Sequence, residues 1–494
     1  MITVASSKNL QEIIDFLGLS RGSFTEAQLN TAIRGISVES SKVMPGYLFA
    51  ALPGARTHGA HFIEDAMGRG AVAILTNPEG AALIETTLPV VSTDHARERM
   101  GPLASYFYDN PGASMKVVAV TGTNGKTTVT SILEYLWNRT GVPAGIIGTL
   151  GARYLDGVES VAIPSARTTP EACELQAELA LMRDSGVRAV AMEVSSHALS
   201  LRRVDGIHFA LSLFTNLTQD HLDFHHSMEE YFEAKSMLFN SSFTDKALIN
   251  IDDEYGNRLF SQSSIPAISI SNEESAHLGE WKIASDSFEI TDPEGQCFLI
   301  DSPLVGNFNR MNVAMALLAF VETGGDLNQG IALIREFPGV PGRLQQVGSG
   351  RPLILVDYAH TPDAVTRVLA SLRPHTKGRI IAVLGCGGDR DPSKRSEMGR
   401  ALQVGADLAI ATSDNPRSEE PAAILDAMCG ADFQGFRIID RREAIAFAID
   451  AANDDDVVLI AGKGHEQGQE SKGVVTPFDD RQVALEILAT RGRS

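Results

Sequence analysis

The chain has 494 residues, which predicts about three domains at roughly 150 residues per domain. Hydrophobic residues make up 44% of it and charged residues 21%, as is typical of a soluble globular protein. The formal net charge of −20 argues against a general nucleic-acid binder or a protein of anionic membrane surfaces, because both need a basic surface. We therefore expect small molecules as partners, and no nucleic acid.

The four cysteines are scattered without a close pair, so neither a disulfide framework nor a zinc site is predicted. This usage fits a reducing cytosol. The N-terminus lacks the basic segment and long apolar run of a signal peptide, and no apolar run approaches the length of a membrane span. We expect a cytoplasmic protein without a membrane span, and a monomer.

The N-terminal part alternates short apolar runs with turn-rich segments. The runs 46–52, 71–76 and 89–94 are predicted as buried strands with helical stretches between them. A turn cluster at 108–114 is a plausible linker. We expect a small α/β domain over residues 1–110.

A central domain is expected over residues 111–345. A short β-branched run at 115–120 leads into a glycine loop and then an amphipathic helix, and further apolar runs at 187–194, 209–217 and 247–251 alternate with helical stretches. That pattern predicts a doubly wound parallel sheet. Between about 265 and 305, short alternating strands favour antiparallel hairpins, and residues 309–325 are predicted as a helix that ends at a glycine pair.

The last domain is expected over residues 346–494. Four apolar runs each lead into a polar or glycine-rich loop, at 352–362, 378–388, 406–416 and 456–464. Open α/β sheets bind ligands at the C-terminal ends of their strands. The predicted fold class is therefore α/β with three domains: the small N-terminal domain, a central domain of the P-loop type and a C-terminal Rossmann-like domain.

The loop after the first central strand is the strongest local signal. Glycines let backbone N–H groups turn toward a phosphate, and the N-terminus of the following helix adds to that field. Lys126 can reach the β- and γ-phosphates, and the Thr127 hydroxyl can bind Mg²⁺. The spacing departs from the common form, which places a glycine at Val120. A loop that merely joins strand to helix is the alternative, but the flanking strand and helix favour ATP. The loop residues are Gly122, Thr123, Asn124, Gly125, Lys126, Thr127 and Thr128.

The form Thr-Gly-Thr-Asn-Gly-Lys-Thr-Thr resembles the loop of Mur ligases and of the similar folylpolyglutamate synthases. Further matching segments follow in the family's order, so that the resemblance covers about residues 30 to 485. They lie at 193–197, 215–217, 220–225, 231–235, 306–312, 342–343, 357–362, 387–391, 414–417 and 462–466. Together they look most like the diaminopimelate-adding members of the family.

This resemblance implies an ATP-dependent ligase of peptidoglycan precursor synthesis. Its substrates would be ATP, UDP-N-acetylmuramoyl-L-Ala-D-Glu and meso-diaminopimelate, with Mg²⁺ as cofactor and an acyl phosphate as intermediate. A lysine-adding ligase of the same family and a folylpolyglutamate synthase-like ligase remain alternatives. A third reading, from another class, is a nucleotide-dependent switch that hydrolyses slowly without any amino acid.

Activating a carboxylate with ATP brings two anions together, which demands concentrated positive charge. Lys126 and Mg²⁺ would supply it. Glu193 follows a buried strand and is a candidate Mg²⁺ ligand beside Thr127, with a solvated carboxylate or a helix cap as the alternatives. From the residues alone, His221 and Lys235 would be surface groups. The resemblance instead implies that Lys235 is N-carbamylated (N6-carboxylysine) and either helps His221 to hold a second Mg²⁺ or orients the γ-phosphate.

The resemblance assigns the remaining positions to three pockets. The nucleotide wall would be Asn307, Arg343, Asp357 and His360, although Arg343 could be a hinge and Asp357 a helix cap. The muramoyl dipeptide would bind at Val38, Ser40, the turn 55–57, Thr168, Thr169, Ser195, Leu201 and Arg203. The diaminopimelate pocket would be Arg390, Asp414, Asn415, Pro416, Arg417, Gly462 and Glu466.

Arg417 decides the expectation for diaminopimelate. A turn explains residues 414–416 but gives Arg417 no role. Its guanidinium fits the distal carboxylate that lysine lacks, while Asp414 and Glu466 would face the ammonium.

Three departures from the family pattern affect the dipeptide site. The usual Asp-Ser-Arg reads Glu39-Ser40-Ser41, Arg167 replaces an asparagine before the threonine pair, and Leu201 replaces a glutamine. One basic group is therefore missing from the first domain.

Overall fold

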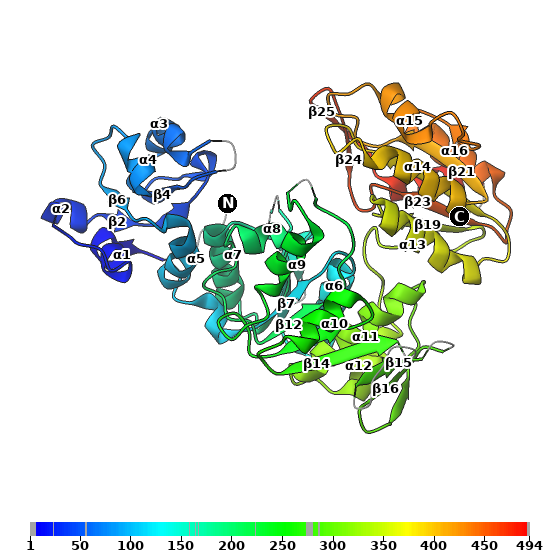
Figure 1. Cartoon of the computed structure of the whole chain (residues 1–494), viewed down its shortest axis with the longest axis horizontal. Helices are drawn as coiled ribbons and strands as arrows, with labels where there is room; N and C mark the ends of the chain where they lie inside the picture. Colours follow the sequence, from blue (N-terminus) through cyan, green and yellow to red (C-terminus); the bar gives the residue numbers. More distant parts are fainter. Residues whose placement is uncertain are drawn as a thin grey trace.

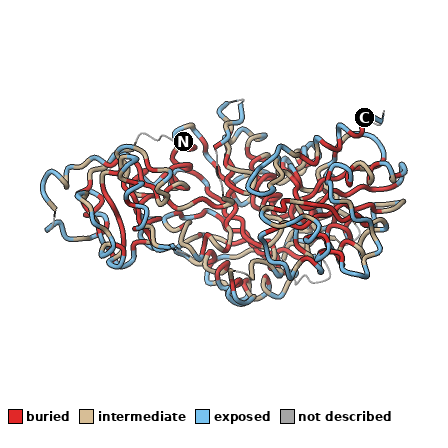
Figure 2. Tube along the Cα trace, turned by 90° about the horizontal axis from the view of Figure 1, so that it is seen from above, coloured by how far each residue is buried: buried red, intermediate tan, exposed pale blue. Residues whose placement is uncertain are grey.

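The computed structural model describes residues 6–22, 24–54, 57–157, 159–163, 165, 167–222, 224–272, 280–284 and 287–491. Ala55 and Arg56 of the expected uridine-binding turn, and Asp223 of the 220–225 segment, lie outside the described residues. Three lobes follow one another in chain order, from the blue N-terminal lobe through the cyan and green centre to the yellow and red C-terminal lobe (Figure 1). Each lobe has buried residues inside and exposed residues around them (Figure 2).

The N-terminal lobe is built on a four-stranded parallel sheet in the order β3-β4-β5-β6. Strands are present at all three predicted runs. The strands are β3 (Gly35–Ser37), β4 (Tyr47–Ala51), β5 (Ala71–Thr76) and β6 (Val90–Ser92), and a second small sheet joins β1 (Lys8–Asn9) to β2 (Ala32–Ile33). The helices are α1 (Leu10–Phe16), α2 (Glu26–Leu29), α3 (Ile63–Gly68), α4 (Pro78–Ala82) and α5 (Ala96–Phe107).

The central lobe is built on an eleven-stranded sheet in the order β10-β9-β8-β11-β7-β12-β13-β14-β15-β16-β17. The strands from β8 to β15 in this order run parallel, as the apolar runs predicted, and β9, β10, β16 and β17 are antiparallel additions. The parallel strands are β7 (Lys116–Thr121), β8 (Ala144–Gly148), β11 (Ala189–Glu193), β12 (Leu211–Phe214), β13 (Ala247–Asn250), β14 (Ala267–Asn272) and β15 (Trp281–Ile283). The antiparallel strands are β9 (Gly151–Asp156), β10 (Glu159–Ile163), β16 (Glu289–Thr291) and β17 (Cys297–Leu299).

The expectation of antiparallel hairpins over the whole of 265–305 is wrong at its start. β14 pairs in parallel with both β13 and β15, and the antiparallel pairing begins only between β15 and β16. A parallel pair needs a crossover connection rather than a tight turn. Alternation of apolar residues cannot distinguish parallel from antiparallel pairing, because successive side chains point to opposite faces of the sheet in both kinds of strand.

Helices cover both faces of the central sheet and bury a hydrophobic core on each. One core contains α6 (Lys126–Arg139) and α11 (Asn307–Glu322), and the other contains α7 (Ala172–Asp184) and α9 (Met228–Ser236). The predicted helix at 309–325 is thus α11, and Gly324 follows it with φ +98°, a conformation that favours glycine. The remaining helices are α8 (Ser196–Ser200), α10 (Glu254–Ser261) and α12 (Leu327–Ile334).

The C-terminal lobe has a six-stranded sheet in the order β18-β19-β23-β20-β21-β22 and a separate hairpin, β24-β25. The strands are β18 (Gln345–Val347), β19 (Leu353–Asp357), β20 (Ile380–Cys386), β21 (Leu408–Ser413), β22 (Phe436–Arg437), β23 (Val457–Ala461), β24 (Gly468–Ser471) and β25 (Val474–Pro477). The helices are α13 (Pro362–Leu372), α14 (Lys394–Gly405), α15 (Pro421–Cys429), α16 (Arg441–Ala451) and α17 (Asp480–Thr490). Insertion of β23 between β19 and β20 creates a switch point, where such sheets bind ligands.

None of the helices in the described ranges is both long and apolar enough to cross a membrane.

A buried carboxyl on α7 makes stability depend on pH. Glu178 is 2% exposed, its Oε2 has no hydrogen-bond partner among the described residues, and burial together with nearby Glu174 raises its pKa to about 8. The unfolded chain has a Glu pKa of about 4.3, so the folded protein holds the extra proton between these values and loses stability as pH rises from about 4.3 to 8.

We expect Glu178→Gln to remove this penalty. The gain in unfolding free energy should be on the order of 3 kcal/mol larger at pH 8 than at pH 5, where most of the penalty has not yet developed. Denaturant unfolding at both pH values measures the difference. Glu336→Gln, at an exposed ion pair with Arg139, is the control and should show no such pH dependence. A gain for Glu178→Gln that does not increase from pH 5 to pH 8 would contradict the raised pKa.

Candidate functional site

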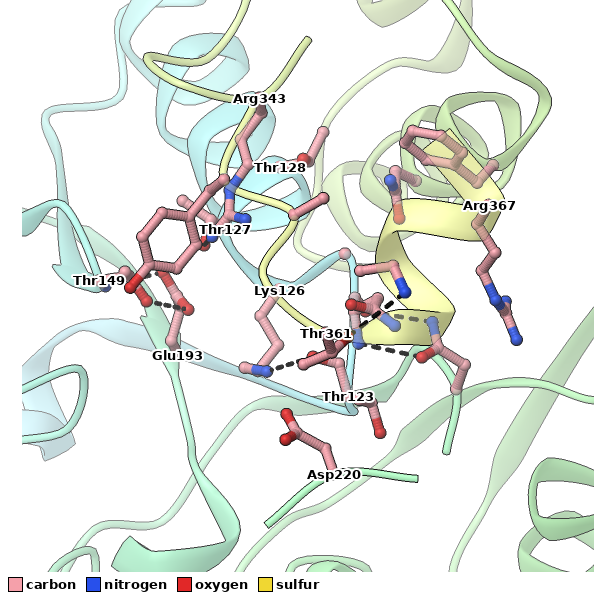
Figure 3. Close-up of a pocket in the computed structure, with 18 of the residues that line it drawn as sticks. Thr123, Lys126, Thr127, Thr128, Thr149, Glu193, Asp220, Arg343, Thr361 and Arg367 are labelled. Carbon is pink, nitrogen blue, oxygen red and sulfur yellow. Dashed lines mark hydrogen bonds between the residues drawn. The ribbon is translucent and has the colours of Figure 1, made fainter. Parts of the chain in front are cut away.

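A cavity of about 800 Å³ lies between the central and C-terminal lobes. Its walls come from the loops after β7, β11 and β12, from the start of α11 and from the loop after β19. The strands β7, β11 and β12 are neighbours in parallel register, so the loops at their C-terminal ends meet at one edge of the sheet. Figure 3 shows side chains from both lobes converging on this space.

The glycine loop is fixed by tight contacts rather than by its own sequence alone. Gly122 and Gly125 have φ of 143° and 89°, and a Cβ atom on them would lie 1.9 Å from Thr215 Oγ1 and 2.4 Å from Asn312 Oδ1. Thr215 Oγ1 donates to Asn124 O at 2.6 Å, and Asn124 N donates to Asn216 Oδ1 at 3.0 Å. Only glycine fits at the two positions. The surrounding residues therefore hold the loop in one conformation, which argues against a loop that merely joins strand to helix.

Lys126 starts α6 and folds back over the loop. Its Nζ donates to the carbonyl oxygens of Gly122 and Thr123, each at 2.8 Å (Figure 3). Burial lowers the pKa of Lys126, while the carboxylates of Glu193 and Asp220 act to raise it. The ammonium group therefore sits in a pre-formed position at the loop, where a phosphate could replace the carbonyl contacts.

Glu193 ends β11 and is 1% exposed. Its carboxylate accepts from Thr149 N at 2.9 Å and from Thr149 Oγ1 at 3.0 Å (Figure 3). The helix-cap alternative does not describe this geometry, because Ser195 is the residue that caps α8. The carboxylate and the buried Thr127 hydroxyl are hard oxygen donors of the kind Mg²⁺ prefers.

Lys235 is not the exposed lysine that the sequence alone suggested. It is 1% exposed on α9, its Nζ lies 2.9 Å from Gly122 O and 3.3 Å from Thr121 Oγ1, and it lies 4.8 Å from the centre of the Tyr231 ring. Burial and the nearby charge of Lys126 hold its pKa well below the usual range. The side chain thus lies directly behind the glycine loop.

His221 lies in the loop after β12, with a φ of 53°. Its Nε2 is 3.4 Å from Asp220 Oδ2, and its ring packs against His197 and Tyr231. Burial lowers the pKa of His221 to about 4, which keeps the ring neutral and able to bind a metal. Across the described ranges, no group of three or more His, Cys, Asp and Glu side chains is arranged to hold a metal ion by itself.

Arg343, just before β18, and the loop after β19 in the C-terminal lobe also line the cavity. Arg343 Nη2 lies 3.2 Å from Thr127 Oγ1, and its guanidinium lies 4.7 Å from the centre of the Tyr358 ring. Arg343 thus reaches Thr127 at the end of the glycine loop (Figure 3), and its expected place beside adenine and ribose stays a prediction.

Asp357 is tied to the backbone at the domain boundary. Its carboxylate accepts from Leu344 N and Ala359 N, each at 2.7 Å, and Thr361 is the residue that caps α13. The alternative of Asp357 as a helix cap is therefore wrong. Asn307 and His360 line the same cavity.

The expected dipeptide-binding residues of the central lobe form the far wall. Thr169 Oγ1 donates to Glu193 O at 2.9 Å, Thr168 Oγ1 lies 3.2 Å from Thr149 Oγ1, and Arg203 pairs with Glu171 at 2.8 Å. Thr168, Thr169, Ser195 and Arg203 all line the cavity. Val38 and Ser40 belong to the N-terminal lobe, and Leu201 follows α8. None of these three residues is among those that line the cavity.

The expected diaminopimelate residues gather at the switch point of the C-terminal sheet, apart from this cavity. Arg417 Nη1 donates to Gly388 O at 2.6 Å, and Asn415 Nδ2 donates to Glu466 Oε2 at 2.8 Å. Gly462 lies against Asp414, and Gly387 lies near Arg390. A Cβ atom on Gly462 would be 2.8 Å from Asp414 Oδ2, and one on Gly387 would be 3.7 Å from the side chain of Arg390. Pro416 belongs to the same cluster, because its carbonyl oxygen packs against Gly388.

Three family models match the chain in the order of its lobes. They are the Mur ligase family catalytic domain at residues 32–108, the Mur ligase middle domain at 120–320 and the Mur ligase glutamate ligase domain at 342–464. A protein of Streptomyces coelicolor is 45% identical over 98% of this chain and 97% of its own length. It is named UDP-N-acetylmuramoyl-L-alanyl-D-glutamate–2,6-diaminopimelate ligase.

The chain belongs to the Mur ligase family.

Other relatives agree. A Pseudomonas aeruginosa protein with the same name is 39% identical over 94% of this chain and 97% of its own length. A solved structure of that name has a TM-score of 0.67 and 32% identity, covering 99% of this chain and all of its own. FolC of E. coli, solved with ADP, has a TM-score of 0.58 at 20% identity over 80% of this chain and 94% of its own, and shares the fold.

Two of the departures from the Mur ligase pattern lie against each other. Arg167 Nη1 donates to Glu39 Oε1 at 2.6 Å, which joins the central lobe to the N-terminal lobe across 128 residues of sequence. Lys42 pairs with Glu39 at 3.1 Å and with Glu174 at 2.5 Å. The central lobe thus brings a guanidinium to the segment where the first domain has Ser41 in place of a basic residue.

The amino-acid cluster contains residues that sequence reasoning missed. Lys463 is fully buried, and its Nζ donates to Asn415 Oδ1 at 2.9 Å and Glu466 Oε2 at 3.1 Å. The β24–β25 hairpin also borders the cluster, because Gln469 Nε2 donates to Asp414 O at 2.6 Å. Lys463 could have been suspected from its place beside Gly462 in the matching segment 462–466, but no comparable sequence pattern pointed to the hairpin.

Proposed function

We propose that this Mur ligase joins meso-diaminopimelate to the D-Glu side-chain carboxylate of UDP-N-acetylmuramoyl-L-Ala-D-Glu at the expense of ATP, in peptidoglycan precursor synthesis. One observation carries the proposal: Lys126, Glu193 and Thr127 line one cavity with Thr168, Thr169 and Arg203. A nucleotide phosphate and an acceptor carboxylate can therefore meet there. The names of the relatives support the choice of substrates.

The reaction needs two substitutions. A carboxylate oxygen attacks the γ-phosphorus of ATP and ADP leaves, which gives an acyl phosphate. The amine of the amino acid then attacks the acyl carbon, and inorganic phosphate leaves as the amide bond forms and the amine gives up a proton. Lys126 and Arg343 place positive charge at the phosphate end of the cavity, where it offsets the repulsion between the two anions.

Mg²⁺ fits the donors at this end of the cavity. The Thr127 hydroxyl and the Glu193 carboxylate would hold one ion together with phosphate oxygens, which is how proteins usually bind it. The ion would neutralise charge on the transferring phosphoryl group. Lys235 as a carbamate and His221 would hold a second one.

The environment of Lys235 supports carbamylation. A carbamate forms when a neutral amine nitrogen attacks CO₂ and loses a proton, and burial keeps this amine neutral. With ¹³C-labelled bicarbonate, wild-type protein should show a carbamate carbon resonance that Lys235→Arg lacks. The same resonance in both proteins would refute carbamylation at this residue.

An ATP-dependent phosphate-release assay tests the function. We expect phosphate only when UDP-N-acetylmuramoyl-L-Ala-D-Glu and meso-diaminopimelate are both present, and a new amide by mass spectrometry. Faster turnover with lysine would instead favour the lysine-adding alternative, and turnover with a folate and glutamate the folylpolyglutamate alternative. Release that ignores every amino acid would favour a nucleotide switch.

We further propose that the enzyme works as a monomer in the cytoplasm on these small molecules. ATP is the phosphoryl donor.

A further inference from the structure

An ion pair joins the C-terminal lobe to the phosphate end of the cavity. Lys394 is the first residue of α14, and its Nζ lies 3.5 Å from Asp220 Oδ1, which belongs to the loop after β12 in the central lobe. Asp220 lines the cavity, and Figure 3 shows its carboxylate directed toward Lys126. The pair therefore connects the two lobes beside the lysine that would meet a phosphate.

This ion pair is partly shielded from solvent. The side chain of Lys394 is 27% exposed and that of Asp220 is 15% exposed. Asp220 Oδ1 also accepts from His221 N at 2.9 Å. Burial acts to raise the pKa of Asp220, but the charges of His221, His360 and Lys394 outweigh it and hold the pKa below its usual range. Because burial lowers the pKa of His221 to about 4, its ring is neutral at pH 7, and Lys394 supplies a charge that persists there.

The stability of α14 does not explain a lysine at this position. The N-terminal end of a helix carries partial positive charge, which disfavours a cation in the first turn. Asp391 also lies near Lys394, but its carboxylate is exposed and accepts from Ser393 N at 3.0 Å and Ser393 Oγ at 2.6 Å. Neither feature accounts for an ammonium that extends to Asp220 of another lobe.

The start of α14 is also anchored to the amino-acid cluster. Arg395 is buried, and its two terminal nitrogens donate to the Glu419 carboxylate at 2.9 and 2.7 Å. Glu419 also accepts from Asp389 N at 2.7 Å, and it lies two residues after Arg417. Movement of the C-terminal lobe would therefore carry the amino-acid cluster and Lys394 together.

We propose that Lys394 is a positioning residue whose ion pair with Asp220 holds the C-terminal lobe over the phosphate end of the cavity while the amide forms. The inference rests on the proposed function. A closed lobe keeps water away from the acyl phosphate and brings the amine to it. When the lobe parts, water can take the place of the amine. Its oxygen then attacks the acyl carbon, inorganic phosphate leaves, and the carboxylate is restored with release of a proton.

A plainer interpretation treats the pair as a surface contact. Exposed ion pairs contribute little, and Lys394 would then be one of many solvated cations. Its removal would leave both the rate and the outcome of the reaction unchanged. The two interpretations therefore differ in the amount of phosphate released per amide formed, which is one when no acyl phosphate is lost to water.

The test compares Lys394→Met with wild type in the presence of ATP, the UDP-linked dipeptide and meso-diaminopimelate. Enzyme is used at a concentration near that of the substrates, so that a slow variant still completes a turnover. We expect the rate of amide formation to fall about tenfold, between the effects of exposed and of buried ion pairs. Phosphate released per amide should rise from one in wild type to about two or more. A loss of folded protein would lower both products together and leave their ratio at one.

Three further variants make the test specific. Lys394→Arg keeps the charge and should keep the ratio at one. Lys377→Met is the matched control, because Lys377 is an exposed lysine of the same lobe that does not line the cavity, and it should behave as wild type. Asp220→Asn already lacks the pair, so the addition of Lys394→Met to it should change the ratio by less than about twofold.

A ratio that stays at one in Lys394→Met would overturn the inference, whatever happens to the rate or to the KM for meso-diaminopimelate. So would a ratio that rises equally in Lys394→Arg or Lys377→Met, or that rises as much again when Lys394→Met is added to Asp220→Asn. These results would leave the proposed function intact. Wild-type protein that makes no amide with meso-diaminopimelate would refute the proposed function, and this inference with it.

Discussion

Lys126→Ala is expected to lower turnover by about a thousandfold or more. One preorganised donor to a developing charge is commonly worth a factor of 100 to 1,000, about 2.7–4 kcal/mol, and Lys126 adds a full charge to its hydrogen bonds. Its Nζ already lies at the glycine loop, where it contacts the carbonyl oxygens of Gly122 and Thr123. Phosphate release at saturating substrates measures the loss, and single-turnover formation of ADP shows whether phosphoryl transfer is the step that fails.

Lys246→Ala is the control for this substitution. Lys246 forms a partly exposed ion pair with Glu322, and neither residue lines the cavity. Its removal takes away one lysine from the same lobe, so turnover should stay within about twofold of wild type. Turnover of Lys126→Ala within tenfold of wild type would contradict the assignment of the nucleotide site.

Much of the fold follows from local pattern, but the order of the strands does not. The strand–loop–helix from β7 to α6 is visible because a β-branched run, two glycines and an amphipathic helix follow one another directly. Nothing local places β23 between β19 and β20, although that insertion creates the switch point. The direction of β14 could not be predicted from its own residues either, since it depends on how β14 pairs with its neighbours β13 and β15.

Some site residues could likewise be predicted from local sequence pattern, and others could not. Glu193 is recognisable because it lies at the end of a buried strand and Lys126 because it follows the loop after another, and parallel strands bring their ends together. The burial of Lys235 could not be read from α9, whose sequence gives no reason to expect a lysine behind the loop of another element. The contact between Arg167 and Glu39 joins two lobes. In the sequence, each of the two residues is only a departure from the family pattern. Their pairing becomes visible only in the three-dimensional structure.

Arg417→Ala is expected to raise the KM for meso-diaminopimelate about 100-fold. A guanidinium that binds a carboxylate through two charge-assisted hydrogen bonds contributes up to about 3 kcal/mol, and the substrate carboxylate would otherwise lose its partner. Arg417→Lys should recover only part of this affinity, because an ammonium cannot form the forked pair. Steady-state kinetics at saturating ATP and dipeptide give the KM, and the KM for ATP should remain unchanged.

Arg442→Ala provides the comparison, since Arg442 lies in an exposed pair with Glu486 in the same lobe and should leave all three KM values at their wild-type level. Loss of Arg417 removes the partner of a distal carboxylate, so it should weaken the binding of meso-diaminopimelate and of L-2-aminopimelate alike, because both amino acids carry that carboxylate. An unchanged KM for both substrates in Arg417→Ala would remove the physical basis for choosing diaminopimelate over lysine, because that choice depends on a cation for the carboxylate that lysine lacks.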